Sequence, residues 1–371
     1  MTKKIDLIVK NGSYVTHKKT IKGDIAIHKG KIYRVGNISD LKSSKTIDAR
    51  GLHILPGAID TQVHFREPGN TDKEDLKSGS RAAVAGGITT VFDMPNNNPS
   101  MSTKTLFKKK LNGAKNRMFC NYAFYFGAEK NNTTEIKKME KEVGCCGIKV
   151  FVGVSTGTLI VSDYKDIKRI MKSTKKMISF HSEDQYELNK REKFIKRGDP
   201  KSHPKWRNES VCLICTKNLV KLANQTKKKI HILHITTAEE IELLNKNKKY
   251  ISYEVTPQHL VLSSPSCYNK LGTLAQMNPP IRSLRHNKRL RQALKNNEID
   301  IVGSDHAPHK LSEKKLEYPD SPSGMPGVQT LLPILLNEVS KKVISINNVV
   351  ELTSYNPINR FKIKNKGLIK E

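Results

Sequence analysis

Eight short apolar runs alternate with segments of helical periodicity, and this pattern constrains the fold more than any other feature of the chain. The runs cover residues 58–65, 88–94, 118–127, 147–153, 177–181, 229–235, 251–255 and 299–304. Segments of helical length connect them, at 73–85, 103–115, 163–174, 212–226 and 237–247. Repeated βα units place parallel strands inside a ring of helices, so the pattern predicts an α/β protein with a closed (β/α)8 TIM barrel.

The segment before the barrel has a different pattern. Apolar and polar residues alternate in residues 5–9 and 24–28, and Lys29-Gly30-Lys31 supplies a hairpin turn to the next strand. We therefore expect three parts in the 371 residues: a small N-terminal β unit at 1–55, the barrel at 56–345, and a C-terminal segment at 346–371 that returns toward the β unit.

The charge and the cysteines narrow the function classes. The formal net charge is +31, but the lysines are spread through nearly every segment rather than gathered on one predicted face, so nucleic acid is not an expected partner. No apolar run is long enough to span a bilayer, which argues against a membrane protein. The six cysteines have neither disulfide-scaffold nor zinc-finger spacing, and a reducing cytoplasm is the expected compartment.

Polar side chains gather where the predicted strands end. The first strand ends in Gln62, His64 and Arg66, which alternate with apolar residues and so share one face. The other ends carry Asn96, Lys149, His181, His234, Asp305 and His309. Because active sites of α/β barrels lie at the C-terminal rim, these residues are expected to converge on one mouth.

Histidine nitrogens and a carboxylate oxygen from different strands are the ligand set of zinc or a similar divalent ion. The candidates are His64, His181, His234 and Asp305. His231 precedes His234 by three residues, so only one of the two can face the barrel mouth; the other is expected to pack or to hydrogen-bond a helix. Asp305 can also carry a proton between water and a leaving group.

Two further positions are open to more than one interpretation. Lys149 lies in a strand too apolar for a free ammonium, so its side chain either reaches the rim or becomes an anionic carbamate that ligates metal. Arg66 and Asn96 can form an anion pocket, in which the guanidinium holds a carboxylate. The alternative for Arg66 is a salt bridge to its neighbour Glu67 or to another acidic residue at the rim.

Four sequence blocks resemble the dihydroorotases, which belong to the amidohydrolase superfamily of metal-dependent barrel hydrolases. The blocks are Val63-His64-Phe65-Arg66-Glu67-Pro68-Gly69, Met94-Pro95-Asn96, Met277-Asn278-Pro279-Pro280-Ile281-Arg282 and Ser304-Asp305-His306-Ala307-Pro308-His309. They occur in the family's order, between about Pro56 and Asn359. The N-terminal β unit also looks like the first part of the small β-sandwich that flanks such barrels.

The resemblance implies a role for each candidate residue. Lys149 would be a carbamylated ligand that bridges two metal positions, of which one is completed by His181 and His234 and the other by His64 and Asp305. The cofactor would be one or two divalent ions, expected to be zinc. Arg66, Asn96 and His309 would hold the substrate carboxylate, Asn278 would meet the pyrimidine ring, and the loop at Pro322–Gly327 would approach the substrate.

Two departures from the family pattern bear on these expectations. The family's first metal-binding strand usually reads His-x-His, whereas this chain has Gln62-Val63-His64, so a neutral amide oxygen stands where an imidazole is usual. The chain also ends where relatives continue into strands that complete the flanking sandwich. Two expectations follow from this: either the accessory unit is reduced, or the chain is incomplete.

The resemblance implies a dihydroorotase, which interconverts L-dihydroorotate and N-carbamoyl-L-aspartate in pyrimidine synthesis. A hydantoinase or dihydropyrimidinase shares the metal centre but acts on rings without this carboxylate. A third possibility, favoured only by Gln62, is a catalytically silent partner subunit of aspartate carbamoyltransferase. The expected partners are a small-molecule substrate and either a second copy of the chain or that carbamoyltransferase.

Overall fold

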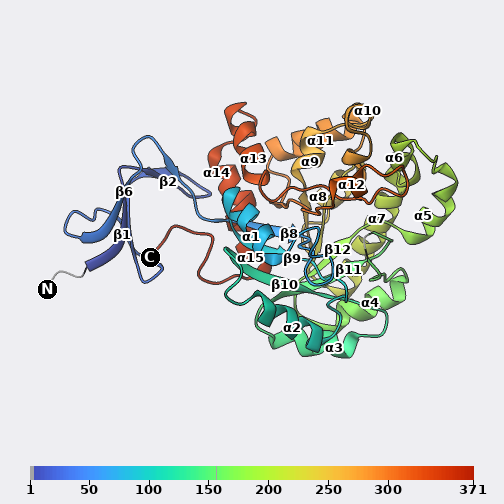
Figure 1. The fold of residues 1–371 in the computed structure, drawn as a ribbon, viewed down its shortest axis with the longest axis horizontal. Coiled ribbons are helices and arrows are strands. Elements are labelled where there is room, and N and C mark those ends of the chain that lie inside the picture. Colours follow the sequence, from blue (N-terminus) through green and yellow to red (C-terminus); the bar gives the residue numbers. More distant parts are fainter. Residues whose placement is uncertain (1–3, 156) are drawn as a thin grey trace. The chain divides into compact units, whose positions relative to one another are not determined.

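An eight-stranded parallel sheet is the largest sheet of the computed structural model, which describes residues 4–155 and 157–371 (Figure 1). Its strands follow one another in chain order, so each pairs with its sequence neighbours. They are β8 Ala58–Val63, β9 Ile88–Asp93, β10 Asn121–Gly127, β11 Cys145–Phe151, β12 Ile178–His181, β13 Ile230–Ile232, β14 Ile251–Val255 and β15 Ile301–Val302. All eight predicted strands are present, and the α/β barrel class is confirmed.

The sheet closes between its first strand and the chain that follows its last. The backbone N–H of His64 donates to the carbonyl of His306 at 2.7 Å, and Val63 forms a parallel bridge with His306. The predicted run 299–304 is longer than β15, because the chain leaves the regular strand before Asp305, whose φ is +48°. Barrel closure therefore brings the segment after β15 beside the segment after β8.

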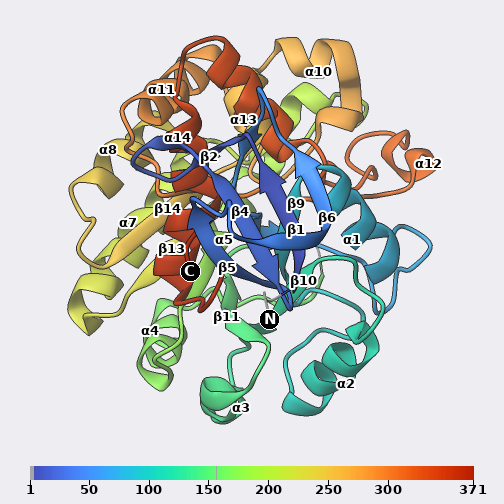
Figure 2. The same cartoon turned by 90° about the vertical axis from the view of Figure 1, so that its left-hand side faces the viewer.

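Helices surround the barrel, and Figure 2 shows several of them arranged as a ring. These are α1 Leu76–Ala85, α2 Lys104–Ala114, α3 Thr133–Lys138, α4 Tyr164–Ser173, α7 Glu209–Thr226, α8 Ala238–Asn245 and α11 Leu284–Lys295. Local sequence fixes where they begin: the Asp75 carboxylate accepts from the backbone N–H of Ser78, and the Thr237 hydroxyl accepts from that of Glu240. The five helical segments predicted from the sequence match α1, α2, α4, α7 and α8.

The remaining elements build the loops and the end of the chain. They are η1 Met139–Lys141, α5 Gln185–Arg191, η2 Glu192–Phe194, η3 Pro200–Ser202, α6 His203–Trp206, α9 Pro257–Val261, α10 Ser266–Leu271, η4 Gly272–Ala275, α12 Leu311–Lys314, α13 Leu331–Ser340, α14 Ile346–Val350, the π-helix η5 Glu351–Tyr355 and α15 Asn356–Phe361. Within residues 4–155 and 157–371, no helix is both long and apolar enough to cross a membrane.

The barrel interior contains a buried polar network below the mouth. The Glu254 carboxylate accepts from the Thr61 hydroxyl at 2.7 Å and lies 3.0 Å from Nε2 of His231. Asp60 accepts from the backbone N–H of Ser304 at 3.0 Å, and burial raises its pKa to about 7. His231 is fully buried, as the packing alternative predicts, and it also lies 2.9 Å from the Ser252 hydroxyl on the neighbouring strand β14.

A second compact unit comprises Met1–Ile59 and Leu336–Glu371, separate from the unit Asp60–Leu335. It contains the sheet β5-β4-β1-β6 and the sheet β3-β2-β7, from β1 Lys4–Lys10, β2 Ser13–Val15, β3 Thr20–Lys22, β4 Asp24–His28, β5 Lys31–Gly36, β6 Lys42–Asp48 and β7 His53–Ile54. The predicted hairpin joins β4 to β5, and both turn residues, Lys29 and Gly30, have positive φ, as type I′ turns require. Within this unit the backbone N–H of Val35 donates to the Glu371 carboxylate at 3.1 Å.

Candidate active site

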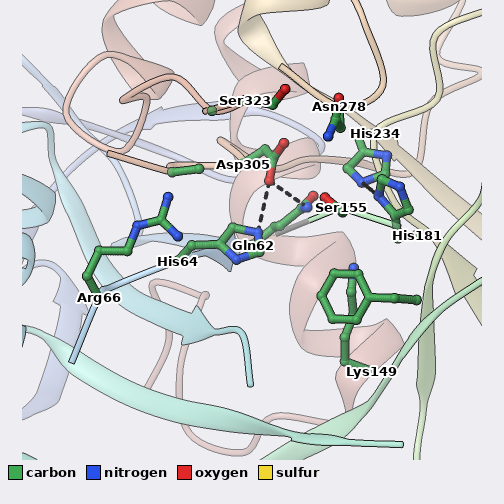
Figure 3. A pocket seen from close by; sticks show the side chains of 13 residues that line it. Gln62, His64, Arg66, Lys149, Ser155, His181, His234, Asn278, Asp305 and Ser323 are labelled. Carbon is green, nitrogen blue, oxygen red and sulfur yellow. Dashed lines mark hydrogen bonds and ion pairs between the residues drawn. The ribbon is translucent and has the colours of Figure 1, made fainter. Parts of the chain in front are cut away.

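A pocket lies at the C-terminal ends of the barrel strands (Figure 3). It brings together eight of the ten residues that the sequence singled out: Gln62, His64, Arg66, Lys149, His181, His234, Asn278 and Asp305. Phe151, Ser155, Ala307, Ser323 and Gly324 complete the lining. Strands far apart in sequence therefore supply one site, as barrel topology predicts.

One side of the pocket is built around the Asp305 carboxylate. The Gln62 amide donates to its Oδ1 at 2.8 Å, and Nε2 of His64 lies 3.1 Å from the same oxygen. No described residue donates to Oδ2, so one carboxylate oxygen is available to a ligand. Asp305 has a φ of +48° and His234 a φ of +39°, left-handed conformations that are uncommon outside glycine and occur often at functional sites.

The other side of the pocket is a pair of imidazoles. Nδ1 of His181 lies 3.0 Å from Nε2 of His234, and Nε2 of His181 lies 2.9 Å from the Glu183 carboxylate. Burial lowers the pKa of both histidines, so both rings are neutral near pH 7. With its single proton on Nε2 facing Glu183, His181 directs an unprotonated Nδ1 toward His234.

Lys149 lies in β11, and its side chain is fully buried. Its Nζ has no hydrogen-bond partner among the described residues and lies 4.4 Å from the centre of the Phe151 ring. Burial lowers the pKa of the Lys149 amine to about 7, although the negative charges of Asp305 and Glu254 oppose the shift. An amine in this state has a substantial neutral fraction near pH 7, and the neutral form is the one that can react with carbon dioxide.

The donor atoms of these residues and the spacing of the two histidines are suited to a divalent metal ion. Three or more His, Cys, Asp or Glu side chains do not form a ready-made metal cluster anywhere in 4–155 and 157–371. However, the buried Nζ of Lys149 and the buried Oε1 of Gln62 both lack hydrogen-bond partners, and the His181 and His234 nitrogens face each other. The ligating nitrogens of two imidazoles on one zinc ion lie about 3.3 Å apart, close to the 3.0 Å between Nδ1 of His181 and Nε2 of His234. The donor set therefore fits a metal provided that Lys149 contributes.

Arg66 forms a cationic wall of the pocket, with 5% of the residue exposed. Its Nε donates to the carbonyl of Pro308 at 2.9 Å, and one terminal nitrogen lies 3.2 Å from Nε2 of His309. Glu67 pairs with Arg117 instead, so the salt bridge considered for Arg66 does not form. No carboxylate among the described residues pairs with this guanidinium, which leaves it available to an anion.

Two of the predicted substrate residues lie behind the lining rather than in it. Oδ1 of Asn96 lies 2.8 Å from Nδ1 of His64, so this amide contacts a candidate metal ligand. Nε2 of His309 lies 3.1 Å from the carbonyl of Ser323, and its Nδ1 lies 3.3 Å from the Lys73 ammonium. Burial and the nearby Arg66 charge lower the pKa of His309 to about 3, so the ring is neutral.

Sequence reasoning overlooked three residues that support the site. Glu183 and Arg207 form a buried ion pair behind His181, and His203 contacts Asn278. The only sequence feature that pointed to Glu183 was its position two residues after His181. In an extended chain, this spacing puts both side chains on the same side of the backbone. Nothing in the sequence placed Arg207 or His203 near the mouth, because both enter it from the segment between β12 and α7.

The amidohydrolase family model matches residues 53–371. The dihydroorotase of Pyrococcus horikoshii is 35% identical to this chain over 366 residues, covering 98% of the chain and 79% of the relative. The dihydroorotase of Methanosarcina mazei is 34% identical over 374 residues, covering 96% and 80% respectively. The chain belongs to the dihydroorotases of the amidohydrolase family. Dihydroorotases of this superfamily are metal-dependent hydrolases of cyclic amides.

Solved structures agree with this dihydroorotase fold. The L-hydantoinase of Arthrobacter aurescens superposes with a TM-score of 0.94 over 99% of this chain and 84% of its own, at 26% identity. The dihydropyrimidinase of Brevibacillus agri has a TM-score of 0.86 at 24% identity and covers 98% and 83%. The second likeness concerns the fold alone, so the choice of substrate depends on the pocket residues.

Proposed function

We propose that this dihydroorotase hydrolyses the ring amide of L-dihydroorotate to N-carbamoyl-L-aspartate and catalyses the reverse cyclisation, using the pocket of Figure 3. The observation that carries the choice of substrate is the buried Arg66 guanidinium, which has no carboxylate partner among the described residues. A buried cation without a counter-ion is costly unless a ligand supplies the anion. A ring that bears a carboxylate does so, whereas hydantoin and dihydrouracil do not.

We propose further that Lys149, as a carbamate, holds one or two divalent ions, zinc by donor type, with His181 and His234 on one side and His64 and Asp305 on the other. When bound, the ion supplies Lewis-acid polarisation of the ring amide carbonyl and lowers the pKa of water. Outer carboxylates commonly fix metal-bound histidines, and Glu183 is placed to fix His181 in this way. Gln62 offers only an amide oxygen, so its side of the site would bind metal more weakly.

Asp305 is the proposed proton carrier. Its Oδ1 is held by Gln62 and His64, while Oδ2 has no donor among the residues described. During hydrolysis Asp305 takes the proton of the attacking water and delivers it to the ring nitrogen as the carbon–nitrogen bond breaks. Cyclisation runs the same transfer in the opposite direction.

Arg66→Met tests the substrate assignment. Truncating one partner of a buried charge pair costs about 2 to 5 kcal/mol, so kcat/KM for L-dihydroorotate should fall roughly 30- to 5,000-fold. Arg81 is exposed on α1, and Arg81→Met is the matched control, which should keep full activity. Metal content should be unchanged in both. Loss of metal or fold with unaltered substrate affinity would make Arg66 structural and would remove the argument for a carboxylate.

We propose that the enzyme works in a reducing compartment such as the cytoplasm. Its six cysteines form no disulfide, which supports this location. Association with a second copy of the chain or with aspartate carbamoyltransferase would be tested by the mass of the purified protein in solution, alone and mixed with that enzyme.

A further inference from the structure

We propose that His203 is a positioning residue that locks the side-chain amide of Asn278 with its N–H donors toward the substrate, so that the pocket selects a ring carbonyl at that position. The inference rests on the proposed function and adds a specificity determinant to it. His203 begins α6, outside the barrel strands, and Asn278 lines the pocket beside His234 (Figure 3).

The contacts of one ring nitrogen determine the amide orientation. Nε2 of His203 lies 3.1 Å from the backbone carbonyl of Met277 and 3.0 Å from Oδ1 of Asn278. A backbone carbonyl only accepts hydrogen bonds, so Nε2 must carry the proton. The Asn278 atom that faces this N–H must then be the acceptor, its oxygen, and the amide nitrogen points away from His203.

The ring is neutral and fixed in this tautomer. Burial and the nearby Arg207 charge lower the pKa of His203 to about 3, and its Nδ1 has no hydrogen-bond partner among the residues described. The ring also packs edge-on against two aromatic rings, with centroids 5.9 Å from that of Trp206 and 5.6 Å from that of Tyr318. It can therefore neither rotate freely nor exchange its donor for an acceptor.

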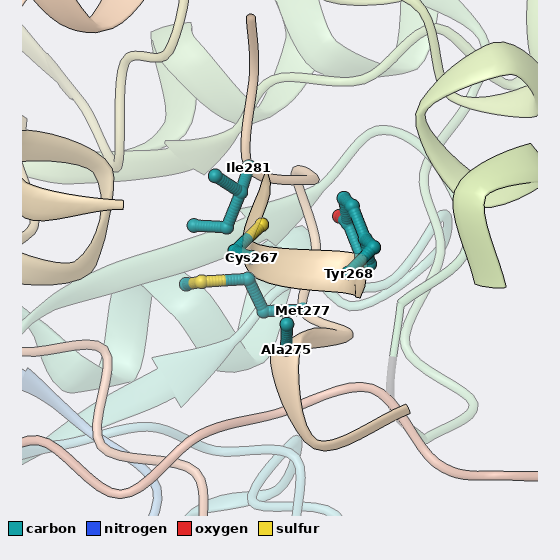
Figure 4. Close-up of a cluster of buried hydrophobic side chains, with 5 residues drawn as sticks. All are labelled: Cys267, Tyr268, Ala275, Met277 and Ile281. Carbon is teal, nitrogen blue, oxygen red and sulfur yellow. The ribbon is translucent and has the colours of Figure 1, made fainter. Parts of the chain in front are cut away.

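Asn278 itself is held on a rigid backbone. Met277 directly precedes it and Ile281 follows three residues later, and both are fully buried in an apolar cluster with Cys267, Tyr268 and Ala275 (Figure 4). With the backbone anchored and Oδ1 occupied, the only freedom left to the side chain is to offer Nδ2. No described residue accepts from Nδ2, so a ligand carbonyl is the partner that this geometry fits.

Kinetics of paired variants test the inference. His203→Phe keeps an aromatic ring between Trp206 and Tyr318 but removes the donor, and kcat/KM for L-dihydroorotate should fall about 2- to 13-fold, mainly through KM, as expected for one neutral hydrogen bond. His203→Gln restores an N–H donor and should recover most of the loss. Asn278→Asp keeps the oxygen that faces His203 but cannot donate to the ring, so it should lose at least as much as Asn278→Ala.

The double variant separates positioning from a merely structural role. In the Asn278→Ala background, His203→Phe should cause no further loss, because the residue through which it acts is absent. An equal loss in both backgrounds, no gain from Gln over Phe, or full activity of Asn278→Asp would overturn the inference. If His203→Phe does not fold, the Gln and Asp variants decide it.

The same experiment distinguishes failure of the inference from failure of the proposed function. If the unmodified protein turns over L-dihydroorotate but the His203 and Asn278 variants do not behave as described, only the inference about His203 is overturned. If the unmodified protein turns over hydantoin instead, the proposed substrate fails, and the same cycle is measured on hydantoin, which also carries ring carbonyls. Absence of turnover with both rings overturns both proposals.

Discussion

Lys110→Met is expected to destabilise the barrel unit strongly and to displace Arg66. The Lys110 ammonium lies 2.6 Å from Asp93 and donates to Oδ1 of Asn97 at 2.7 Å. Both side chains of the ion pair are essentially inaccessible, at 1% and 0% exposed. Burial lowers the pKa of Lys110 and raises that of Asp93, while their mutual attraction opposes both shifts.

This buried pair holds the two ends of the Arg66 backbone segment. Asp93 accepts from the backbone N–H of Phe65 at 2.9 Å, and the Asn97 amide donates to the carbonyls of Phe65 and Glu67 at 3.0 and 3.1 Å. Removing Lys110 leaves a buried carboxylate without its counter-ion. Breaking such a pair costs about 3 to 5 kcal/mol. For a unit of this size, the melting temperature should fall by roughly 5 to 9 °C.

The assay is thermal unfolding followed by circular dichroism, with kcat/KM for L-dihydroorotate measured on the same preparations. Lys109 is the adjacent residue and is exposed, so Lys109→Met should change stability by no more than about 0.5 kcal/mol. Adding Asp93→Asn to Lys110→Met removes the unpaired charge and should recover part of the loss. Equal melting temperatures for the Lys109 and Lys110 variants would refute the reasoning, because the pair would then contribute nothing.

Three further predictions concern the site. Lys149→Ala should abolish turnover and reduce bound metal, and short carboxylic acids or bicarbonate should restore part of the activity; full activity without them would exclude a carbamate role. Gln62→His should raise the metal content from about one ion per chain toward two, since imidazole replaces a weak amide donor; elemental analysis that gives two ions in the unmodified protein would contradict this. The pKa of His203 is about 3 in the folded protein against 6.5 in the unfolded chain, so the unfolded state binds more protons and stability falls as pH drops from about 6.5 toward 3. His203→Phe should make that fall shallower, as measured by urea unfolding at several pH values, and an unchanged slope would show that His203 is charged in the folded protein.

The barrel could be predicted from the sequence because its strands are buried on both faces, and such strands have continuous apolar sequences. The residues Gln62, His64, Lys149 and Asp305 could be assigned to one mouth for the same reason, since each ends or interrupts such a run. The barrel topology alone brings these positions together, so they can be assigned to one site before any side-chain contact is known.

The supporting contacts could not be predicted in the same way. Asn96 bonds His64, and His203 bonds Asn278, across separations of 32 and 75 residues that no periodicity connects. The short β15 and the positive φ of Asp305 likewise follow from barrel closure rather than from local propensity. Tertiary packing determines these features, so they become visible only in the three-dimensional structure.

Steady-state turnover in both directions is the direct test of L-dihydroorotate as the substrate. The purified protein, supplied with zinc, would be assayed for hydrolysis of L-dihydroorotate and for cyclisation of N-carbamoyl-L-aspartate, with hydantoin and dihydrouracil as rings that lack the carboxylate. We expect turnover of both carboxylate substrates and a strong preference for L-dihydroorotate over the other two rings. Preferential turnover of hydantoin, or no turnover of any ring by metal-loaded protein, would contradict this expectation.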